Sequence, residues 1–156
     1  MKEKLWLFIV KFILVSAPLF LLWHWKGEGW YLVFLNHLYS YLFVRILGMN
    51  ILFFAPPADI FNSLIPFVSL MIITREIKLK PRLYRLALGL SIMIAWHVVL
   101  TEVVYLLHDA QGVPSRAYER LSVPFYIFSE TMPFVLWVLF AHKQVAGLFL
   151  GRKKKS

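Results

Sequence analysis

The chain has 156 residues, of which 60% are hydrophobic and 17% aromatic, and it carries a formal net charge of +9. This apolar share is far above that of an ordinary soluble domain. It predicts a single integral membrane domain, an all-α bundle of helices covering residues 1–156. The sequence contains no cysteine, which excludes disulfides, thiolate metal sites and a cysteine nucleophile.

Four stretches of the sequence are candidates for crossing a bilayer, which takes about 20 residues per helix. In chain order they cover approximately residues 5–25, 58–75, 86–107 and 121–141. The first follows the charged start MKEK, and no small-residue cleavage site comes after it, so it is predicted to be an uncleaved anchor. The second is short and has to begin near Ala58.

The segment 30–47 is ambiguous, because it mixes aromatic residues with Asn36, His37, Ser40 and Arg45. It either crosses as a fifth span or lies on the outer side as an amphipathic or re-entrant helix. We expect turns before and after it, at residues 26–29 and 48–50, where glycines occur.

Basic residues gather in three places: at Lys2 and Lys4, in the segment 75–85, and in the tail. The bias of Lys and Arg toward the cytoplasm therefore predicts four spans in the inner cell membrane, with both termini cytoplasmic. The tail residues are expected to contact anionic lipid head groups; they are Arg152, Lys153, Lys154 and Lys155. Basic residues at helix ends do not indicate nucleic-acid binding.

The third span has one polar face. At 100° per residue, His97 and Thr101 lie 40° apart, and Tyr105 and Glu102 follow within 140° of His97. Most of the aliphatic residues, including Leu100, fall on the opposite side. The polar face is expected to look into the bundle, and the aliphatic face to meet lipid.

Two other spans show the same pattern, which predicts a shared polar pocket in the outer half of the bundle. Ionisable groups in the interior of a membrane have to be protonated or paired, and Arg45 is the cation expected to pair with them if 30–47 packs nearby. The predicted pocket-lining residues are Glu102, Glu130, His97, Asp59, Asn62, Ser63, Arg45, Thr101, Tyr105, Ser129 and Tyr126.

Two interpretations of this pocket remain open. Polar side chains often only hold membrane helices together, whereas ionisable groups at depth often bind a substrate, a lipid head group or a proton. A zinc site from His97, Glu102 and His108 is disfavoured, because the spacing differs from helical zinc motifs. No phosphate-binding loop or nucleophile motif is present, so no cofactor or metal is predicted and the sequence does not assign catalytic residues.

The order of features resembles the core of the exosortase and archaeosortase family over roughly residues 8–145. An N-terminal anchor and an aromatic amphipathic stretch precede the proline-containing segment "FFAPPADIFNSL". A span, the basic loop "REIKLKPRLYR", a polar span, an outer loop and a last span follow. The resemblance implies a membrane protein associated with the sorting of proteins that carry C-terminal tails.

The chain departs from that family at the catalytic positions. The family uses a Cys, then an Arg and a His, whereas this chain has residues 59–63, "DIFNS", where the Cys is expected. The resemblance therefore implies either a non-catalytic relative of these enzymes or, as we favour, an accessory protein associated with them. The expected partner is a membrane-bound sorting protease or its substrate tail. The alternatives are a small intramembrane hydrolase or a transport component that uses Glu102 and Glu130.

Overall fold

The computed structural model describes residues 5–49, 58–74, 77–108 and 115–149, with only the backbone described for 58–60, 105–108, 115–122 and 143–149. In these residues every regular element is a helix. The all-α bundle predicted from the sequence is therefore confirmed. Its elements are α1 (Leu5–Leu22), η1 (Trp23–Gly27), α2 (Glu28–Tyr39), η2 (Ser40–Ile46), η3 (Ala58–Ser63), α3 (Leu64–Ile73), α4 (Leu79–His108) and α5 (Ser115–Phe149).

Three helical segments of the described chain are long and apolar enough to cross a membrane. They are Leu5–Ile46, Leu79–Val104 and Val123–His142, and a shorter apolar helix covers Phe61–Ile73. The six residues of η3 and the ten of α3 together rise about 27 Å. This is close to the ~30 Å thickness of the hydrocarbon core, so the 3₁₀ turns of η3 extend a helix that is short by itself.

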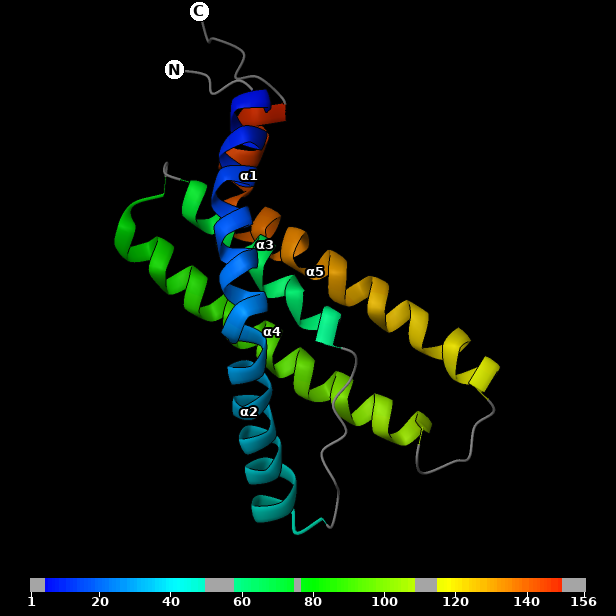
Figure 1. Cartoon of the computed structure of the whole chain (residues 1–156). Coiled ribbons are helices and arrows are strands. Elements are labelled where there is room, and N and C mark those ends of the chain that lie inside the picture. Colours follow the sequence, from blue (N-terminus) through cyan, green and yellow to red (C-terminus); the bar gives the residue numbers. More distant parts are fainter. Residues whose placement is uncertain (1–4, 50–57, 75–76, 109–114, 150–156) are drawn as a thin grey trace, which may run out of the picture.

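The first segment is one continuous helix, and the turn expected at residues 26–29 is wrong. Figure 1 shows α1 and α2 as a single rod, because the chain passes from one to the other through the wide π-helical turns of η1. Two glycines without a proline do not stop the helix, because each glycine costs only about 1 kcal/mol of helix propensity. The rod ends at the predicted place, where Gly48 adopts the left-handed region with φ 66°.

The rod is much longer than a bilayer is thick. Its 42 residues correspond to about 60 Å, twice the hydrocarbon thickness. The segment α2 therefore continues in the direction of α1 instead of returning beside it.

The short helix α3 is the centre of the bundle, and seven of its ten residues are buried. It lies against α1, α4 and α5. The main hydrophobic core contains buried side chains of α3, α4 and α5, against which Phe8 and Phe12 of α1 pack. A helix that is apolar on all sides belongs in such a central position.

The helices alternate in direction along the chain. In Figure 1 the start of α1 and the end of α5 lie together at one end, and the end of α2 lies toward the other. The chain runs away from that first end in α1, returns in α3, runs away in α4 and returns in α5 (Figure 1).

Two side-chain contacts fix α5 to its neighbours near a kink. Its backbone leaves helical geometry at Ala141 (φ −117°, ψ 22°), and Arg85 of α4 donates a hydrogen bond of 2.5 Å to the carbonyl of Phe140. One turn earlier, Trp137 Nε1 donates to Thr74 Oγ1 at the end of α3, over 3.0 Å. Both bonds join residues that are distant in the sequence.

Candidate functional site

His97 is the centre of a buried polar cluster between α2, η3 and α4. Its side chain is fully buried. Its Nδ1 lies 2.6 Å from the hydroxyl of Tyr31, and its Nε2 lies 3.3 Å from the hydroxyl of Ser63. Because a hydroxyl can either donate or accept, both ring nitrogens have suitable partners whichever of them carries a proton.

Aromatic rings close the space around this imidazole. The ring of Phe61 meets it edge-on with centroids 5.0 Å apart, and the ring of Tyr31 does so at 5.7 Å. The hydroxyl of Thr101 bonds to the His97 backbone carbonyl at 2.8 Å, so Thr101 lies on the same face without reaching the ring. His97 is thus held in place on all sides.

Glu102 has a separate partner one and a half turns further along α4. The hydroxyl of Tyr39, a fully buried residue, donates a hydrogen bond of 2.5 Å to Glu102 Oε2. Together with the bond between Tyr31 and His97, this gives two polar connections between α2 and α4. Polar side chains of α4 therefore bond to α2, and His97 and Glu102, which were expected in one cluster, each bond to a different tyrosine.

The sequence reasoning did not identify Tyr31 or Tyr39 as partners. A signal was present, because Tyr31, Leu35 and Tyr39 follow at intervals of four residues and so share one helix face. Leu35 and Tyr39 are fully buried. Because a turn was expected at 26–29, the segment after it was interpreted as a helix on the outer side of the membrane. The shared face of these three residues was therefore not recognised as a packing face.

Three of the predicted placements need correction. Leu100 and Val104, expected to meet lipid, are buried against Phe125 and Tyr126 of α5, because α4 has neighbours on two sides. Arg45, expected to reach the acids, is exposed on η2 and forms no ion pair within the described part of the chain.

Glu130 lies in a different environment from His97 and Glu102. It is exposed and lines a groove of about 560 Å³ beside α1. We call this the α1–α5 groove; its lining is Phe12, Ser16, Ala17, Phe20, Leu21, Asn62, Ile65, Pro66 and Glu130. The single shared pocket predicted from the sequence is thus divided into an internal cluster around His97 and an open groove around Glu130.

The remaining predicted residues fall into two groups. Ser129 is buried, and its hydroxyl has no hydrogen-bond partner within the described residues, while Tyr126 is half-buried against Leu100 and Val104. The side chains of Asp59 and Tyr105 and the tail residues Arg152, Lys153, Lys154 and Lys155 lie outside the described part of the structure.

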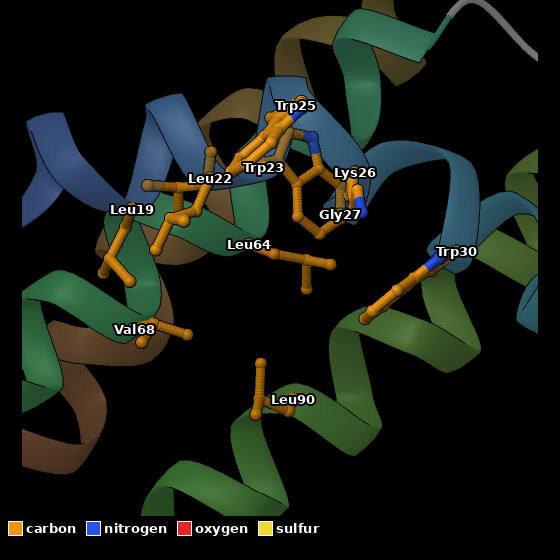
Figure 2. Close-up of a pocket in the computed structure, with 11 residues that line it drawn as sticks. Leu19, Leu22, Trp23, Trp25, Lys26, Gly27, Trp30, Leu64, Val68 and Leu90 are labelled. Carbon is orange, nitrogen blue, oxygen red and sulfur yellow. The ribbon is translucent and has the colours of Figure 1, made fainter.

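A second open space, which we call the α1–α4 groove, also lies beside α1 and has a volume of about 520 Å³. Its lining includes Leu19, Trp23 and Lys26 of the first rod, Val68 of α3, and Leu90 of α4. Figure 2 shows Trp23, Trp25 and Lys26 along one edge of this space and Leu90 across from them. The helix α1 therefore lines two grooves, and Ile65 of α3 belongs to the lining of both.

The chain matches no family model, no curated protein and no solved structure. Its function has to be inferred from these two grooves and the internal cluster.

Proposed function

We propose that the chain is a non-catalytic accessory membrane protein that holds a membrane-embedded segment of a partner in the α1–α5 groove. The observation that carries this proposal is the composition of the groove. It opens between exposed apolar side chains such as Phe20 and Leu21, yet it contains the carboxyl group of Glu130 and the amide of Asn62.

Such a groove suits another helix better than lipid tails. The amide oxygen of Asn62 is buried and has no hydrogen-bond partner among the described residues, and polar groups inside a membrane are usually turned toward another protein segment. Membrane helices associate through small residues, which allow close approach, and through polar side chains that bond across the interface. The groove offers both, because Ser16 and Ala17 stand opposite Asn62 and Glu130 along its walls.

The internal cluster supports an accessory role over catalysis. His97 is fully buried, and both its ring nitrogens already have hydroxyl partners within the protein. A catalytic base needs to reach the proton it removes, whereas a buried and fully bonded His serves to fix helices. We therefore favour this role over a hydrolase or transporter using Glu102 and Glu130, since the two acids lie among different partners.

The partner class follows from the resemblance described above. We propose a membrane-bound sorting protease of the exosortase kind, or the apolar tail of its substrate, as the occupant of the groove. We also propose that the protein resides in the inner membrane with both termini in the cytoplasm, because Lys and Arg gather at the start of the chain, in the segment 75–85 and in the tail, and such residues favour the cytoplasmic side.

A photo-crosslinking amino acid at position 17 tests this function in the source cell. We expect adducts with an envelope-processing membrane enzyme or its substrate tail, and we expect Glu130→Gln to reduce them. The matched control is position 139, because Leu139 is 63% exposed on α5 but does not line the groove. If position 17 gives only the lipid adducts seen at position 139, the proposal is wrong.

A further inference from the structure

We infer that the α1–α4 groove is a binding site for one anionic phospholipid, with an acyl chain in the groove and the phosphate beside Lys26. This site is separate from the α1–α5 groove, and it does not depend on the partner proposed for that groove.

The body of the groove has the chemistry of an acyl-chain site. Its walls are aliphatic, with Leu19 and Leu22 from α1, Leu64 and Val68 from α3, and Leu90 from α4. Its volume of about 520 Å³ falls within the range of roughly 300–1,000 Å³ that ligand sites occupy. Figure 2 shows these side chains facing one open space from three helices.

The rim of the groove has the chemistry of a head-group site. Three of the six Trp residues of the chain, Trp23, Trp25 and Trp30, gather there with Lys26. Trp25 and Trp30 are 76% and 73% exposed. Exposed tryptophans are typical of the level at which hydrocarbon gives way to head groups.

The position of Lys26 along the helix agrees with a location at the boundary between hydrocarbon and head groups. From Leu5 to Lys26 the helix rises about 31 Å, close to the ~30 Å thickness of the hydrocarbon core. When the start of α1 lies at one surface, Lys26 therefore lies at the other. The aliphatic wall then occupies the adjoining leaflet, where an acyl chain would extend from a phosphate at the rim.

Charge favours an anionic lipid over a zwitterionic one. Lys26 is the one charged side chain among the described lining residues. Its ammonium lies 5.4 Å from the centre of the Trp25 ring, a contact that keeps the cation at the rim without neutralising it. The nearby acid Glu28 pairs with His24, with 3.3 Å between Glu28 Oε2 and His24 Nδ1, so it is not the partner of Lys26.

Lipid titration of the purified full-length chain in detergent micelles, followed by native mass spectrometry, tests this site. The probes are phosphatidylglycerol and phosphatidylcholine with identical acyl chains. We expect tighter binding of phosphatidylglycerol, and we expect Lys26→Gln to weaken it roughly fivefold, the effect of one basic side chain near anionic lipid. Binding of phosphatidylcholine should weaken less in that variant, because its choline ammonium offsets the charge of its phosphate. The control is Lys78→Gln, an exposed lysine outside the groove.

A second variant tests the groove itself. Val68→Phe fills the space between α3 and α4 and should weaken both lipids, whereas Ile72→Phe, on the exposed side of α3, should weaken neither. Equal affinity for the two lipids, or the same loss in Lys26→Gln and Lys78→Gln, would overturn the assignment. An unchanged lipid count in a folded Val68→Phe protein would do so as well.

Discussion

Replacement of Gly89 by Ala is a sharp test of how closely the helices pack. A Cβ at this position of α4 would overlap the ring of Phe67 and lie 3.1 Å from Phe140 Cε2. Phe67 is fully buried at the centre of the bundle, and its ring meets that of Phe140 edge-on with centroids 6.4 Å apart. The ring therefore has little space into which it can move.

Two opposing effects determine how much Gly89→Ala changes the free energy of unfolding. A Gly-to-Ala change within a helix gains about 0.8–1.0 kcal/mol of helix propensity, whereas overpacking a core costs about 1–3 kcal/mol. The control is Gly29→Ala in α2, where a Cβ would meet nothing within 4 Å. Because the propensity gain is common to both variants, Gly89→Ala should be less stable than Gly29→Ala by about 1–3 kcal/mol.

Reversible unfolding in mixed detergent micelles, followed by circular dichroism, measures this difference. Phe67→Leu should restore part of the loss when it is combined with Gly89→Ala, because a smaller side chain makes room for the methyl group. Equal free energies of unfolding for the Gly89 and Gly29 variants would show that α3 and α4 do not approach each other as described.

Three further predictions concern single hydrogen bonds and one exposed residue. Tyr31→Phe leaves a buried nitrogen of His97 without its partner and should lower the free energy of unfolding by about 1–3 kcal/mol; no loss in the same unfolding assay would contradict this. Arg85→Leu removes the hydrogen bond to the Phe140 carbonyl and should lower the free energy of unfolding by about 1 kcal/mol. An unfolding midpoint equal to that of the wild-type protein would argue against this contact at the kink. Arg45→Leu should leave the yield of folded protein unchanged, because Arg45 is exposed; a clear drop in size-exclusion recovery would show that it pairs with a buried acid.

The sequence predicted the helices well, because hydrophobic content and length determine them directly. The short second span was expected to begin near Ala58, and η3 begins there. The end of the first segment was also predicted, since Gly48 allows a left-handed conformation that stops a helix. These features depend on local sequence alone.

The site was predicted only in part, because it depends on which helix lies beside which. His97 and Thr101 of α4 are buried, as the polar face predicted, but a helix wheel cannot identify Tyr31 and Tyr39 as the partners of His97 and Glu102. The wheel also assumes a single buried face, and α4 packs on two sides, so Leu100 was placed wrongly. Glu130 was expected beside Glu102, yet the rotation of α5 turns it toward α1.

The arrangement of the chain across the membrane is the claim on which both grooves depend, and cysteine labelling measures it directly. Because the chain contains no cysteine, single cysteines can be placed at positions 26, 48, 80, 112 and 153 and treated with a membrane-impermeant thiol reagent. We predict labelling in intact cells at 26, 48 and 112, and at 80 and 153 only after permeabilisation. Labelling of position 80 or 153 in intact cells, or protection of position 48, would contradict the account.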